Sequence, residues 1–99
     1  MRVVEFRSLL DAENALRVWF EVDSGEVQRF RVQLECLFQY WTAVLRYDMA
    51  HGFADCDKIH PYGDNEKVRM VTQDYNEALT VAIQDVSLNW RRYRRRYQE

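Results

Sequence analysis

Arg29-Phe30-Arg31-Val32-Gln33-Leu34-Glu35-Cys36 alternates polar and apolar side chains without a fault. Successive side chains of a β-strand point to opposite faces, so this pattern is typical of a strand with one face on the core and one in water. In residues 16–22 an apolar side chain recurs at every second position, and the turn-forming stretch Asp23-Ser24-Gly25-Glu26 follows them. The two segments are therefore predicted to form a β-hairpin.

Working outward from this hairpin, the pattern predicts three more strands. Strands are expected at about 3–6, 16–22, 27–37, 41–47 and 67–72. The apolar residues of 27–45 also fit the three- and four-residue spacing of a helix, and periodicity alone leaves that alternative open. Strands are favoured because the alternation in 29–36 is strict and the preceding turn suits a hairpin.

The C-terminal segment has the pattern of one long amphipathic helix, from about 75 to about 97. Its apolar and aromatic residues recur at helical spacing. Asp74 is a good N-cap, and Glu77 three residues later resembles a capping box. Strands followed by one helix indicate an α+β fold, with an antiparallel sheet of three to five strands packed against the helix.

Length and composition indicate one domain, 1–99. The 99 residues are too few for two stable cores, and 47% hydrophobic with 30% charged residues is typical of a globular protein. No run approaches the roughly 18 apolar residues of a membrane span, and no signal peptide is apparent. Cys36 and Cys56 are isolated in sequence, which favours two reduced thiols in a cytoplasmic protein over a single bridge.

Residues 48–66 are predicted to form a functional loop, because both histidines, the only proline and two of the three glycines gather there. Histidines are suited to proton transfer near neutral pH, and an arginine fork binds phosphate. Such a set suits metal-independent RNA cleavage, without a cofactor, by attack of the 2′-hydroxyl on the neighbouring phosphate. The candidate catalytic residues are Arg46, Tyr47, Asp48, His51 and His60.

Two other interpretations of this loop stay open. Oxygen and nitrogen ligands for manganese, iron or zinc are offered by Asp48, His51, Asp55, Asp57 and His60, although their spacing matches no standard metal motif. Alternatively, the loop is mainly structural, since proline, glycine, asparagine and aspartate favour turns. Whether the protein is an enzyme is thus undecided by the residues.

The chain ends in a basic segment. Residues 91–99 hold five of the 14 Lys and Arg but only one of the 16 Asp and Glu. Arginines interleaved with aromatic residues suit nucleic-acid binding, and the candidates are Arg91, Arg92, Arg94 and Arg95. The alternative is a solvated helix face, in which the aromatic residues continue the core stripe and the arginines point outward.

One set of residues carries a family resemblance: Leu45 to Ala54, Asp57, His60-Pro61, Gly63, Asn76 to Thr80, Gln84-Asp85, Asn89-Trp90, Tyr93 and Arg96. In these residues the chain resembles a family of small uncharacterised bacterial and archaeal proteins. The resemblance implies that the loop and the helix form one unit.

More loosely, the layout is similar to TumE-like toxins of toxin–antitoxin systems, which are small strand-rich proteins. Arg46-Tyr47-Asp48 matches their Arg-Tyr-Asp segment, and His51 and His60 follow it in the same region, although those toxins carry more histidines. The resemblance implies a toxin-like ribonuclease acting on RNA.

The alternative hypothesis is a non-catalytic interaction module, such as an antitoxin-like or oligomerising protein. It would bind a cognate protein partner or form a homo-oligomer through exposed apolar residues such as Trp19 and Phe38.

Overall fold

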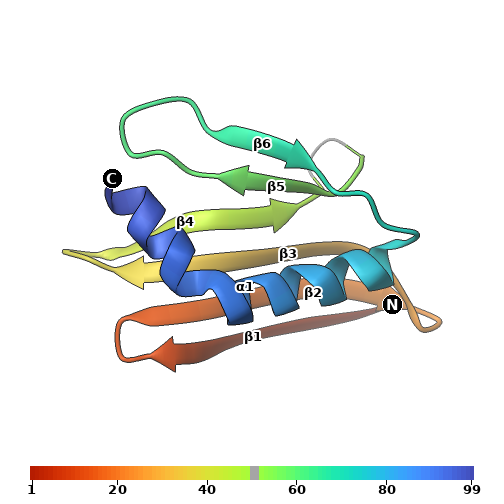
Figure 1. Ribbon diagram of the computed structural model, residues 1–99. Helices are drawn as coiled ribbons and strands as arrows, with labels where there is room; N and C mark the ends of the chain where they lie inside the picture. The colour runs from red at the N-terminus through yellow and green to blue at the C-terminus, as the bar shows by residue number, and fades with distance from the viewer. Residues whose placement is uncertain (50–51) are drawn as a thin grey trace.

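The computed structural model describes residues 1–49 and 52–99. The described chain contains β1 (Arg2–Asp11), β2 (Asn14–Asp23), β3 (Glu26–Leu37), β4 (Trp41–Asp48), β5 (Asp55–Lys58), β6 (Glu66–Arg69) and α1 (Tyr75–Gln98). The strands form one antiparallel sheet in the order of the chain, and α1 lies across one side of it (Figure 1). The α+β prediction is confirmed, with six strands instead of three to five.

The strand alternative for residues 27–45 is confirmed, since this segment forms β3 and most of β4. Two predicted boundaries were too narrow or misplaced: β1 spans 2–11 instead of 3–6, and β6 spans 66–69 instead of 67–72. The predicted loop 48–66 also contains β5. The sequence pattern does not indicate this strand, because two of its four residues are aspartates on one face. Cys56, which lies between them, is buried.

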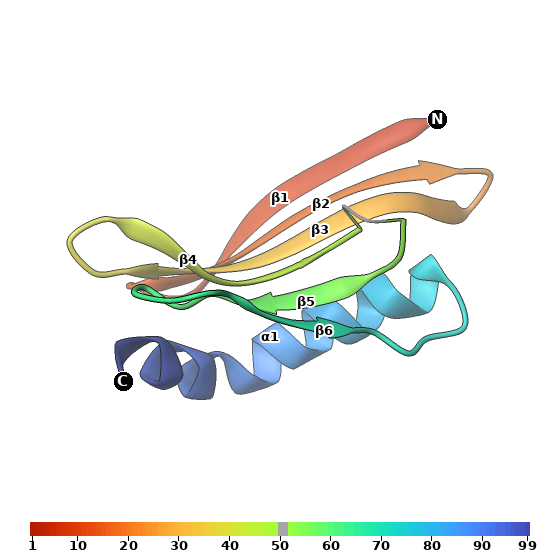
Figure 2. The ribbon, with the colours of Figure 1, turned by 90° about the horizontal axis from the view of Figure 1, so that it is seen from above.

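The core lies between α1 and the middle of the sheet. Helix α1 packs chiefly against β3, with further contacts to β2 and β4 (Figure 2). Fully buried Ala78, Ala82 and Val86 form the contact stripe of the helix. Because these side chains are small, the helix backbone can approach the sheet closely.

The first turn of α1 is tied to both its own cap and the β2–β3 hairpin. The Asp74 carboxylate accepts a hydrogen bond from the Glu77 N–H at 2.8 Å, as predicted for an N-cap. Glu77 in turn accepts from the N–H of Gln73, one residue before the cap. Asn76 accepts from the Val27 N–H at 2.7 Å and donates to the Gly25 carbonyl at 3.1 Å.

The two sides of the sheet differ in chemistry. We call the side under α1 the helix face and the other side the open face. On the helix face, one row of directly opposed residues crosses all six strands: Phe6, Val18, Val32, Tyr47, Cys56 and Val68. The adjacent row on the open face is polar: Arg7, Arg17, Gln33, Arg46, Asp57 and Lys67. In the described residues, no helix is long and apolar enough to cross a membrane.

Candidate functional site

The predicted catalytic segment Arg46-Tyr47-Asp48 is divided between the two faces of the sheet. Tyr47 is buried on the helix face, whereas its neighbours Arg46 and Asp48 lie on the open face. Arg46 donates from Nε to the Gln33 side-chain oxygen at 2.8 Å. Asp48 is 3.9 Å from the Arg31 guanidinium. These three side chains therefore do not converge on one substrate.

Tyr47 belongs to a hydrogen-bond cluster that joins β4 to α1. Its hydroxyl donates to the Asp85 carboxylate at 2.5 Å, and Tyr93 donates to the same oxygen at 2.6 Å. Asn89 donates to the second oxygen at 2.8 Å. Burial and the bond to Asp85 raise the pKa of Tyr47, and the same causes raise the pKa of Tyr93 to about 12. Both phenols thus stay protonated and act as donors near neutral pH.

The two thiols are buried and free, and neither is activated. Cys56 lies beside Tyr47, and burial raises its pKa to about 11. Burial also raises the pKa of Cys36 to about 11. Since the thiolate is the nucleophile, neither cysteine is suited to nucleophilic catalysis near neutral pH.

His60 follows β5 and lies at the end of that strand remote from Asp48. Its Nε2 is 4.0 Å from the Glu66 carboxylate, which also binds Arg96 of α1 and lies 4.0 Å from Lys58. The cationic neighbours of Glu66 lower the pKa of its carboxyl, with Arg96 contributing most. The other predicted histidine, His51, lies outside the described residues.

The aspartates proposed as metal ligands gather on the open face, with a lysine beside them. Asp48 and Asp55 are directly opposed on β4 and β5, and Asp57 lies on the same face. The Lys67 ammonium is 3.1 Å from Asp57 and 3.8 Å from buried Asp55. Across 1–49 and 52–99 no group of acidic, histidine or cysteine side chains is arranged to hold a metal ion.

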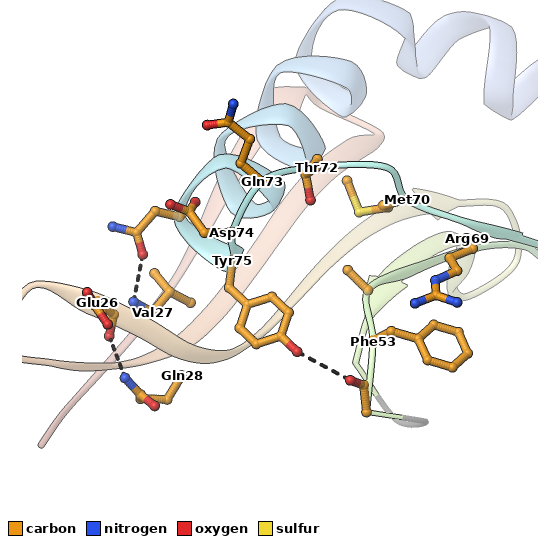
Figure 3. Close-up of a pocket in the computed structure, with 13 residues that line it drawn as sticks. Glu26, Val27, Gln28, Phe53, Arg69, Met70, Thr72, Gln73, Asp74 and Tyr75 are labelled. Atoms are coloured by element: carbon orange, nitrogen blue, oxygen red, sulfur yellow. Dashed lines mark hydrogen bonds between the residues drawn. The ribbon is translucent and has the colours of Figure 1, made fainter.

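A cleft of about 610 Å³ opens at the first turn of α1, and its lining includes Gly52, Phe53 and Ala54 of the predicted loop but none of the predicted site residues that the structure describes (Figure 3). The Tyr75 side chain extends across the cleft, and its hydroxyl donates a hydrogen bond to the Gly52 carbonyl at 3.3 Å. On the far wall, the Arg69 guanidinium lies 4.3 Å from the centre of the Phe53 ring. Its walls come from three distant segments, so no local sequence motif could have indicated it.

The predicted nucleic-acid-binding arginines differ in their surroundings. Arg94 is held against the sheet: it donates to the carbonyls of Glu13 and Leu37 and to the Asn14 side chain. Arg91 and Arg92 are exposed and lie over Trp90 and Tyr93, the aromatic residues beside them. Arg95 is exposed. Trp90 is buried in the core, as the solvated-face alternative expects.

The two edges of the sheet are unlike. Strand β6 has four residues, all exposed, and three of them are charged. Strand β1 has ten residues, and its exposed apolar side chains are Val3 (56%), Phe6 (42%) and Leu9 (60%). Trp19 and Phe38, which were expected to form an apolar patch, are half-buried instead; the Phe38 ring stacks on Tyr97 with centroids 5.5 Å apart.

Comparison with known proteins identifies a family but no activity. A family model described as a domain of unknown function (DUF7718) matches residues 1–99. No curated protein and no solved structure matches the chain.

Proposed function

We propose that this chain, which belongs to the DUF7718 family, is a non-catalytic interaction module that binds its partner along the free edge of β1. One observation carries the proposal: β1 is a ten-residue edge strand with exposed Val3, Phe6 and Leu9. In the described chain its outer side has no neighbouring strand. The row of free N–H and C=O groups along such an edge is a template for another strand.

The contrast with β6 supports a functional edge. Proteins protect sheet edges with short strands and charged residues, especially lysine. Strand β6 has these features, since it is four residues long and carries Glu66, Lys67 and Arg69. Strand β1 is long, and its exposed apolar side chains lie on both faces of the sheet: Val3 and Leu9 on the open face, Phe6 on the helix face. A partner strand would cover the apolar groups as well as the backbone.

The dispersal of the candidate catalytic residues favours this hypothesis over a toxin-like ribonuclease. Acid–base cleavage of RNA needs the proton-transfer groups and the phosphate-binding arginine within hydrogen-bond reach of one substrate. Among the described residues, Arg46 binds Gln33 on the open face and Tyr47 binds Asp85 on the helix face. His60 stands beside Glu66 at the remote end of β5.

Photo-crosslinking inside cells tests the proposal even though the partner is unidentified. A photoreactive phenylalanine analogue replaces Leu9 on β1 in one variant and Leu88, an exposed leucine of α1, in the matched control. We expect a covalent protein adduct from position 9 and none from position 88. Adducts from neither position, or from 88 alone, would overturn the proposal. Growth arrest with RNA cleavage that is lost in His60→Ala would support the ribonuclease instead.

A further inference from the structure

We infer that the partner of the β1 edge is β1 of a second copy of this chain, paired antiparallel with Phe6 of one copy opposite Phe6 of the other. This inference rests on the proposed function and specifies its partner and register. It follows from the strand's own sequence, because β1 is complementary to itself in one alignment.

Backbone geometry restricts how two copies of β1 can meet. Only alternate residues of an edge strand direct their N–H and C=O groups toward the free side. Residues of the same alternating set must therefore lie opposite one another, and open-face residues pair with open-face residues. The symmetry axis is then perpendicular to the sheet, so both copies of α1 lie on the same side of one continuous sheet.

Charge selects among the alignments that remain. With Phe6 opposite itself, Glu5 of each copy faces Arg7 of the other, and Val3 faces Leu9. Sliding one copy along the other to the next permitted alignment in one direction places Glu5 opposite Glu5. Sliding it to the next permitted alignment in the other direction places Arg7 opposite Arg7. Like charges directly opposed are destabilising, whereas opposite charges contribute favourably. The alignment centred on Phe6 avoids both repulsions and also pairs the exposed apolar residues Val3, Phe6 and Leu9 with one another.

The contacts within one copy leave these charges available. The Glu5 side chain is 58% exposed, and among the described residues its carboxylate forms one loose ion pair, 3.9 Å from Arg17. Arg7 donates from Nε to Glu35 at 3.3 Å, with its guanidinium 4.4 Å from the centre of the Trp41 ring. A guanidinium has five N–H donors, so its outer nitrogens can reach the partner's Glu5 while Nε keeps its bond.

Two features of the single sheet agree with this pairing. The apolar row on the helix face ends at half-exposed Phe6, and a second Phe6 would extend it across the axis into the other copy. The register between β1 and β2 is regular from Arg2 to Leu9 and shifts only between Leu9 and Asp11. The paired segment 3–9 therefore lies wholly within the regular part of the strand.

A charge exchange between two variants tests the register. Glu5→Arg alone places arginine opposite Arg7, and Arg7→Glu alone places glutamate opposite Glu5, so each variant should self-associate about tenfold or more weakly than the wild type. Mixed in equal amounts, the two variants form a heterodimer in which every opposed pair again has opposite charges. We expect sedimentation of the mixture to recover wild-type association. A mixture that stays as weak as the single variants would overturn the register.

A disulfide test needs no change of charge and guards against variants that fail to fold. Directly opposed residues bring their Cβ atoms within about 4.5–5.5 Å, close to disulfide geometry. Phe6→Cys should therefore form an oxidised dimer. Val4→Cys is the matched control, because its opposite residue would be Ser8. The native thiols, Cys36 and Cys56, are buried.

The outcomes separate this inference from the proposed function. An oxidised dimer of the Phe6→Cys variant, with none from the Val4→Cys variant, supports the inference. A disulfide-linked dimer from Val4→Cys alone overturns the register, and the edge remains the interface. A chain that stays monomeric but gives a photo-adduct with another protein from position 9 overturns the second-copy partner, and the proposed function stands. A monomer without any adduct from position 9 overturns both.

Discussion

Replacing Arg94 by alanine should destabilise the fold strongly, because this arginine fastens the last turns of α1 to the sheet. Its side chain is only 19% exposed. Its guanidinium donates to the Glu13 carbonyl at 3.1 Å, the Asn14 side chain at 2.8 Å and the Leu37 carbonyl at 3.0 Å. Each hydrogen bond from a charged donor is worth about 1.5–3 kcal/mol, and such bonds on one group are not additive. We expect a loss of about 3 kcal/mol in the free energy of unfolding.

The measurement is urea unfolding followed by tryptophan fluorescence, at one fixed protein concentration because any self-association would add stability. In a domain of this size about 3 kcal/mol also lowers Tm by about 12–24 °C. Arg95→Ala is the matched control, since exposed Arg95 is the next residue of the same helix and should change stability by less than about 0.5 kcal/mol. Equal effects of the two substitutions would refute the anchoring role of Arg94.

The remaining predictions concern buried polar groups. Tyr47→Phe removes a donor to the Asp85 carboxylate and should lower the free energy of unfolding by about 1.5–3 kcal/mol in the same urea assay. The raised pKa values of Tyr47 and Tyr93 mean that their stabilising contribution is complete below the ordinary value of 10.0 and is lost as the pH rises toward about 12. A Tm series above pH 9 should therefore fall less steeply in Tyr47→Phe. Burial alone would raise the pKa of Glu35, but hydrogen bonds from Arg17, Gln33 and Arg7 outweigh it and hold that pKa below its ordinary 4.5. Stability should consequently decline as the pH falls through the acid range, and Glu35→Gln should flatten that decline; an unchanged acid slope would contradict the assignment.

The alternating pattern predicted the central strands because their side chains divide cleanly between core and solvent. Residues 29–36 alternate with this division, and they lie in β3. Strand β1 was under-predicted because as an edge strand it is exposed on both faces, so residues 7–11 show no such division. Strand β5 was missed because one of its faces consists of acidic side chains in contact with Lys67, which only the folded sheet brings near.

The candidate site was harder to predict, although the strand predicted at 41–47 already separates two of its residues. Neighbouring residues of a strand point to opposite faces, so Arg46 and Tyr47 cannot share one site. In the same way, Arg94 follows Trp90 by four residues, and this spacing places it on the buried side of the helix. The cluster around Asp85 could not be predicted, because no sequence rule indicates that a phenol 38 residues earlier lies beside this carboxylate.

The order of the strands has a consequence for folding kinetics. Every strand of this sheet pairs with its neighbour in the chain, so the sheet can form by successive closure of short hairpins. In the described chain, helix α1 makes the hydrogen bonds of largest sequence separation, such as the bond between Arg94 and Glu13, which lie 81 residues apart. Loop closure over that separation is slow relative to hairpin formation, so docking of α1 should be the late step. Until it docks, the helix face of the sheet stays open to water, and a nascent or unfolding chain is most prone to aggregate at that stage.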